Sequence, residues 1–394
     1  MIREGALARR NRDRQNSLGH TLAQVQRRFE NSPLAKIGDL LAGMIADVQR
    51  SIETGGSSSA DAEAMARYVA GVLEMLPNSF GDRFMFDGQL IHHLAEECSQ
   101  GRAKLSGMLV PKPSQGWGHQ SLIMPSFDKK TAHVVDVIHL PGDDNLADID
   151  LLDYPFICHE LGHNILFRDG GNFINAFGQE LDAAVAAIQQ QTLGIRGAAK
   201  QVADSTMAHM KRYWTPTADQ YNWAHEIAVD VVALWLCGPA YLAALQDVME
   251  TDSLRPYQLG QSHPPYEIRA KALIETAGRL GWAYYTGAIQ TLVDRWSSNA
   301  SIDTKTNLHV ACADPRLLSG AISAALQLCK SLLLPCCTPA RIKSLDEKER
   351  QGQGAEFGTD LILAAWLTRS QSTEAAYEEW ERSIIPRLLA DITE

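Results

Sequence analysis

Long hydrophobic runs are missing from this chain of 394 residues. No segment has about 18 consecutive apolar residues, the length that a transmembrane helix needs, and the N-terminus lacks the apolar stretch of a secretory signal. We therefore expect a soluble, unexported protein that has no membrane as a partner.

Cysteine pairs with C-x-x-C spacing are missing too. The seven cysteines are odd in number, are scattered from Cys98 to Cys337 and form no C-x-x-C pair. This pattern excludes the disulfide framework of a small secreted protein, and reduced thiols in the cytoplasm fit it better.

An excess of positive charge is also absent, because the formal net charge is -11. A chain of this charge is poorly suited to a nucleic-acid backbone, so we expect no nucleic acid as a partner. Residues 1–30 are locally basic. We interpret them as a solvated helix start or a frayed terminus, in preference to a partner-binding arm.

The chain does contain a zinc-hydrolase signature, His-Glu-x-x-His, formed by His159, Glu160 and His163. On a helix, positions i and i+4 lie on one face, so both histidines can bind a single metal ion. Glu160 lies beside the pair and is suited to take a proton from a water on the metal. An amphipathic helix whose histidines are satisfied by hydrogen bonds is the plainer alternative.

A second pair at i, i+4 spacing, Glu226 and Asp230, lies in an apolar segment. Burial of two carboxylates needs a reason, and a metal ion supplies one. We predict Glu226 as the third ligand and Asp230 as the acceptor for the free nitrogen of a ligand histidine.

His225 and His209 are rival third ligands, but we favour Glu226 because Asp230 shares its face. We interpret His209, His139 and His119 as surface or core histidines that are satisfied by hydrogen bonds, in preference to metal ligands.

These segments, together with His263-Pro264 and Arg269, resemble the gluzincin metallopeptidases, most closely the group of the CAAX prenyl protease and the heat-shock protease HtpX. The order HExxH, ExxxD and HPxxxxR carries the resemblance over residues 130–280. It implies zinc, proteolytic activity, and His263 or Arg269 near the substrate or the developing oxyanion. Members of that group are often embedded in membranes, whereas this chain has no spanning segment, so a prenylated substrate is not implied.

Apolar periodicity and strand-forming runs predict a mainly helical α+β protein. We expect a zincin-like core of the minimal thermolysin type between helical flanks: a helical region at 1–104, a metallopeptidase domain at 105–285 and a helical region at 286–394. Strands are expected at 121–124 and 133–140. The second of them is expected to be an edge strand that holds an extended peptide. Tyr284 and Tyr285 are predicted either to reach the cleft or to lie in the core.

The function that the sequence predicts is zinc-dependent endopeptidase activity, with Glu160, His263 and Arg269 as catalytic residues and His159, His163 and Glu226 as Zn²⁺ ligands. The expected partner is a peptide or protein substrate, and a regulatory protein that binds the helical flanks is a further candidate. Two alternatives remain: a zinc hydrolase of non-peptide substrates, and a partner-binding protein with a structural or vestigial metal site.

Overall fold

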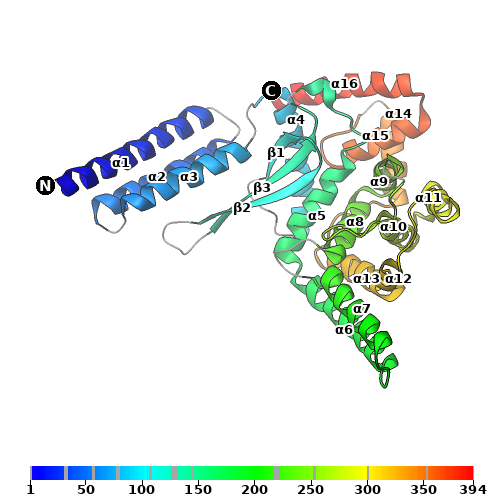
Figure 1. Cartoon of the computed structure of the whole chain (residues 1–394). Helices are drawn as coiled ribbons and strands as arrows, with labels where there is room; N and C mark the ends of the chain where they lie inside the picture. Colours follow the sequence, from blue (N-terminus) through cyan, green and yellow to red (C-terminus); the bar gives the residue numbers. More distant parts are fainter. Residues whose placement is uncertain are drawn as a thin grey trace. The chain divides into compact units, whose positions relative to one another are not determined.

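The structure is a computed structural model of a mainly helical α+β protein (Figure 1). It describes residues 2–30, 34–55, 58–76, 80–103, 105, 109–125, 132–143, 145–216, 222–251, 254–299, 301–351 and 354–393. Contacts between Cα atoms divide the chain into two compact units. Unit 1 comprises Met1–Gln89 and Ser106–Ile149, and unit 2 comprises Leu90–Leu105 and Asp150–Glu394.

Unit 1 contains a bundle of three helices, α1 (Ile2–Phe29), α2 (Ala35–Glu53) and α3 (Ser59–Met75), followed by the first half of α4 (Asp82–Ser99). Apolar residues at helical spacing predict a helix over 34–52, and α2 confirms it. Its apolar residues recur at helical spacing, and Ile37, Leu41 and Ile45 are buried in the bundle. The guanidinium of Arg28 on α1 donates to the carbonyl oxygens of Leu73 and Leu76, which stabilises the C-terminal end of α3.

The three strands of unit 1 form one sheet in the order β1-β3-β2. The bounds are β1 (Leu109–Ser114), β2 (Gly118–Pro125), β3 (Ala132–Pro141), and a short 3-10 helix, η1 (Leu146–Asp148), follows. β1 pairs in parallel with β3, with Leu109 opposite Asp136, and β2 pairs antiparallel with β3, with Gly118 opposite His139. Val110, Val135 and Val137 belong to the same hydrophobic core as the helices of the bundle.

The expectation that the strand at 133–140 is an edge strand is wrong. β3 is central and is paired on both sides, so its backbone is not available to an extended peptide. The error came from β1, which the sequence did not reveal because Pro111 and Pro113 interrupt it. Proline cannot donate to a ladder and is tolerated mainly in edge strands, which is the position of β1.

Unit 2 is built around α8 (Trp223–Cys237), in which every residue is buried. This helix packs against α5 (Pro155–Asp169), α10 (Tyr266–Leu280) and α13 (Pro315–Ser331), as Figure 1 shows. A helix apolar on all sides is expected at the centre of a core. The apolar pattern of the sequence predicts a helix over 217–236, but residues 217–221 lie outside the described part of the chain. The N-cap is Asn222, whose side chain accepts from the backbone N–H of His225.

The remaining helices of unit 2 surround this centre. They are α6 (Gly171–Gln191), α7 (Ala198–Trp214), α9 (Pro239–Thr251), η2 (Ala283–Thr286), α11 (Gly287–Ser298), α12 (Asn307–Cys312), α14 (Pro339–Arg350), α15 (Thr359–Gln371) and α16 (Glu374–Thr393). Among the described residues, none of the helices combines the length and the apolar character needed to cross a bilayer.

This division differs from the three regions expected at 1–104, 105–285 and 286–394. The strands share a core with the N-terminal helices, while α13 and α15 of the C-terminal region pack on α8. The amphipathic faces were visible in the sequence. Which faces pack together depends on contacts between distant segments, which periodicity does not specify.

Candidate metal centre

Two packed helices, α5 and α8, carry the predicted ligands. Pro155 occupies the first turn of α5, where its missing N–H costs nothing. His159 and His163 then lie one turn apart on α5, and Glu226 lies in the first turn of α8. All three residues are buried, with 1–7% of their surface exposed.

Close packing of α5 on α8 depends on Gly162. A Cβ atom built at Gly162 would lie 3.0 Å from the Cβ atom of Val229 on α8. Because Gly162 and Val229 both belong to packed helices in the core, neither helix can shift to make room for a methyl group without a loss of packing energy. Gly162 therefore permits the approach that brings His159 and His163 to Glu226.

Gly162→Ala is accordingly expected to lower the free energy of unfolding by about 1–3 kcal/mol, because the added methyl group overpacks the α5–α8 contact. Urea titration with and without added Zn²⁺ measures this loss. Gly178→Ala is the matched control. A Cβ at Gly178 meets nothing within 4 Å, so the better helix propensity of alanine should leave stability equal or raise it. Equal stability of the Gly162→Ala and wild-type proteins would contradict the packing argument.

The side chains of His159, His163 and Glu226 converge on one point. One ligand atom from each lies within 4.8 Å of the others, and among the described residues this is the one group of three or more His, Cys, Asp or Glu side chains with such geometry. The Nε2 atoms of His159 and His163 lie 3.6 and 3.7 Å from Oε2 and Oε1 of Glu226. These distances exceed the usual hydrogen-bond range, which ends at about 3.2 Å.

The same distances fit ligands that share a cation. Two ligand atoms, each about 2.0–2.2 Å from a tetrahedral ion, lie about 3.3–3.6 Å apart. Oε2 of Glu226 is buried and accepts no hydrogen bond within the described part of the chain. A buried carboxylate oxygen normally accepts a hydrogen bond, so the lack of one at this oxygen also favours a bound ion. The group of His159, His163 and Glu226 can therefore hold a metal ion.

Asp230 orients the first ligand histidine. Its Oδ1 atom lies 3.0 Å from Nδ1 of His159. We assign the proton to Nδ1, which donates to this carboxylate and leaves Nε2 directed at Glu226. The predicted role of Asp230 as a hydrogen-bond acceptor agrees with this geometry.

The electrostatics of the group favour a cation. Burial alone would lower the pKa of His159, but Asp230 and Glu226 outweigh burial and raise it to about 10. For Glu226 the effect of burial has the opposite sign, because burial alone would raise the pKa of a carboxyl group. The charges of His163 and His159 outweigh burial and lower the pKa of Glu226 to about 2. With no metal bound, the carboxylates hold a proton on His159, and a metal ion would replace that positive charge.

Arg269, one of the predicted catalytic residues, is paired with Asp230. Its Nε and Nη2 atoms donate to Oδ2 and Oδ1 of Asp230 at 2.9 and 2.7 Å, and the residue is 8% exposed. Burial opposes the charges of both groups, but their mutual attraction keeps the pKa of Asp230 well below its usual range. Arg269 is thus a positioning residue that fixes Asp230, and through it His159.

Tyr241 on α9 completes this network, and the sequence analysis missed it. Its hydroxyl donates to Oδ1 of Asp230 and lies 3.0 Å from Nδ1 of His159. Burial, followed by the nearby charge of Asp230, raises the pKa of Tyr241, so the phenol stays protonated. The one available signal was general: a buried tyrosine hydroxyl needs a hydrogen-bond partner.

Glu160 and His263 complete the set of predicted residues. Glu160 is 5% exposed and lies near enough to His159 for its charge to raise the pKa of that imidazole. The side chain of His263 is 64% exposed, and its Nε2 atom lies 3.6 Å from Oε2 of Glu226. His263 is therefore the solvent-exposed neighbour of the three-residue group.

The rival histidines lie elsewhere. His225 is buried beside Phe173 and is not part of the ligand group. Nδ1 of His209 pairs with the carbonyl oxygen of Ser205, and His119 pairs with Asp136, so both are satisfied as preferred from the sequence. His139 is half-buried on β3, outside the ligand group.

The core alternative for the tyrosine pair is wrong, because Tyr284 and Tyr285 are both exposed. Tyr284 is 90% exposed, so it does not lie in the core. Tyr285 packs edge-on against Trp366 and Tyr284.

Comparison of the chain with protein-family models, with curated proteins and with solved structures gives no match. The case for a function therefore depends on the residues of the site themselves.

Proposed function

We propose that this protein is a zinc-dependent peptidase of the gluzincin type, with a zincin-like core formed by α5, α8 and α10. The observation that carries the proposal is the buried group of His159, His163 and Glu226, with the free nitrogen of His159 held by Asp230. Three protein ligands are the number typical of a catalytic zinc site, whereas structural zinc sites have four. The ligand count thus favours an enzyme over a partner-binding protein with a structural metal.

In the proposed reaction, each polar residue has one task. Zinc, when bound, supplies a Lewis acid that lowers the pKa of a water toward about 7 and polarises the carbonyl of the substrate. Glu160 accepts the proton of the attacking water and later returns it to the leaving amine. His263 donates a hydrogen bond to the developing oxyanion. Asp230, Arg269 and Tyr241 keep His159 in one tautomer and orientation.

Metal removal and proteomics together test the proposal. Purified protein is expected to contain one zinc per chain, to create new peptide termini in a proteome-derived peptide mixture, and to lose this activity to a chelator and regain it with Zn²⁺. His159→Ala/His163→Ala should lose the zinc, because two of three ligands are removed, while His209→Ala, the matched surface control, should keep it.

The outcomes separate the alternatives. Zinc retained by the double variant would refute the assigned ligands. Stoichiometric zinc without any new termini would refute peptidase activity and favour a non-peptide hydrolase.

His263→Ala is expected to lower kcat by about 10²–10³-fold, because one donor to the developing charge is lost. Zinc content and melting temperature should stay unchanged, since the side chain is largely exposed. Steady-state kinetics with a substrate from the peptide screen give kcat. Unchanged turnover would exclude His263 from catalysis.

A further inference from the structure

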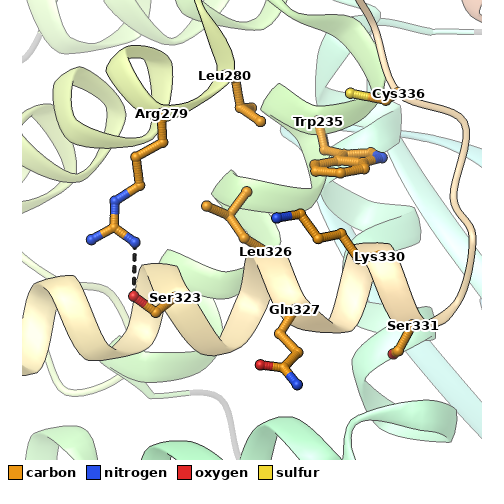
Figure 2. A pocket seen from close by; sticks show the side chains of 9 residues that line it. All are labelled: Trp235, Arg279, Leu280, Ser323, Leu326, Gln327, Lys330, Ser331 and Cys336. Carbon is orange, nitrogen blue, oxygen red and sulfur yellow. Dashed lines mark hydrogen bonds between the residues drawn. The ribbon is translucent and has the colours of Figure 1, made fainter.

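Unit 2 contains a cavity of about 790 Å³ that the proposed metal centre does not use (Figure 2). It is lined by side chains from the end of α8, the end of α10 and one face of α13, and by Cys336 after α13. Its volume falls within the range of about 300–1,000 Å³ that is typical of small-molecule sites.

The cavity is separate from the metal centre. Trp235, which lines it, follows Glu226 by nine residues on α8, which corresponds to about 13 Å along the helix and about half a turn around it. Arg279 likewise follows Arg269 by ten residues on α10, or about 15 Å. The two sites thus occupy opposite ends of the same helices.

One wall of the cavity is apolar and well fixed. Trp235, Leu280 and Leu326 contribute to it, and Figure 2 shows their side chains facing the same space. The indole N–H of Trp235 donates to the carbonyl oxygen of Leu334 at 3.0 Å. Because this donor is already used, Trp235 offers its ring to a ligand and no hydrogen bond.

The polar wall carries positive charge without acidic side chains. Arg279 and Lys330 both line the cavity, and none of the lining residues is Asp or Glu, although the chain as a whole has a net charge of -11. The two cations differ in their partners. Arg279 is paired with Glu275 and donates to Ser323 at 2.7 Å, whereas Lys330 has no ion pair with any residue that the structure describes.

From these features we propose that the cavity binds a small amphipathic monoanion, a carboxylic acid with an aromatic or aliphatic body. The carboxylate pairs with Lys330, and the side-chain amide of Gln327, which also lines the polar wall, offers it a hydrogen bond. The apolar body packs on Trp235, Leu280 and Leu326. A ligand with one negative charge matches the site, because Arg279 is already paired with Glu275 and Lys330 is the lining cation without an ion pair among the described residues. This inference does not depend on the proposed peptidase activity.

Calorimetric titration of the full-length protein tests the proposal with four probes: 3-phenylpropionate and octanoate, and their neutral amides. The acids are expected to bind saturably, and the matching amides about ten- to a hundredfold more weakly, because they lack the charge-assisted contact. The aromatic and aliphatic acids together show which body the apolar wall prefers.

Two variants locate the binding. Lys330→Gln should weaken binding of the acids by about tenfold or more, while Lys343→Gln, which removes the same charge from an exposed site on α14, should not. Leu280→Asn should weaken acids and amides alike, because it removes apolar contact. Equal binding of acid and amide, unchanged binding in Lys330→Gln, or no saturable binding of any probe at about 5 mM would each overturn the proposal.

Discussion

Replacement of Glu160 by Gln is expected to reduce turnover of a peptide substrate by about 10²–10⁴-fold, because the amide cannot accept the proton of the attacking water. Gln has nearly the shape of Glu, and Glu160 is not one of the three ligands, so the fold and the zinc content should stay as in the wild type. Steady-state kinetics, metal analysis and a melting curve on the same preparation measure all three quantities.

Glu378→Gln is the matched control for this change. Glu378 is largely exposed on α16 and lies 3.9 Å from Arg382, a surface pair that contributes little. Its replacement should leave turnover unchanged. Full activity of Glu160→Gln would refute the proposed mechanism, even if zinc were present.

The second large effect is expected from Asp230→Ala. This change leaves the buried guanidinium of Arg269 without its bidentate partner, a loss that costs about 3–5 kcal/mol of unfolding free energy. It also frees the Nδ1 atom of His159, which should weaken metal binding by about 10–100-fold. Urea unfolding of the metal-free protein and a competition titration with a chelating dye measure the two losses separately.

A double variant separates the two roles of Asp230. In Asp230→Asn/Arg269→Met neither side chain carries a charge, so much of the lost stability should return. Metal affinity should stay low, because the carboxylate that orients His159 is still absent. If the double variant regained full metal affinity, Asp230 would act through stability alone and the positioning role would be wrong.

The residues of the candidate metal centre could be predicted from sequence because each pair lies within one helix. His159 with His163, and Glu226 with Asp230, obey i, i+4 spacing, and a helix fixes their common face without any tertiary information. The choice of Glu226 over His225 also followed from helical geometry.

Contacts between separate elements were harder to predict. Tyr241 reaches Asp230 because Gly238, with φ of 51°, ends α8 and lets α9 turn back toward it; the Gly238-Pro239 pair indicates a helix break but not the direction of the next helix. The pairing of Arg269 with Asp230 joins α10 to α8, and sequence spacing within α10 does not specify which acidic residue of another helix Arg269 meets. The edge position of β1 depended on strand order, which a sequence interrupted by prolines does not reveal.

The complete burial of α8 has a consequence for how the centre can open. Helices α5, α7, α9, α10, α13 and α15 all contact it, so its amide groups meet solvent only when unit 2 unfolds as a whole. Fraying, the low-energy opening of most helices, is therefore unavailable to the element that carries Glu226 and Asp230. Amide hydrogen exchange in α8 is then governed by the global stability of unit 2. A metal-binding residue can leave the centre only if the helices that surround α8 move.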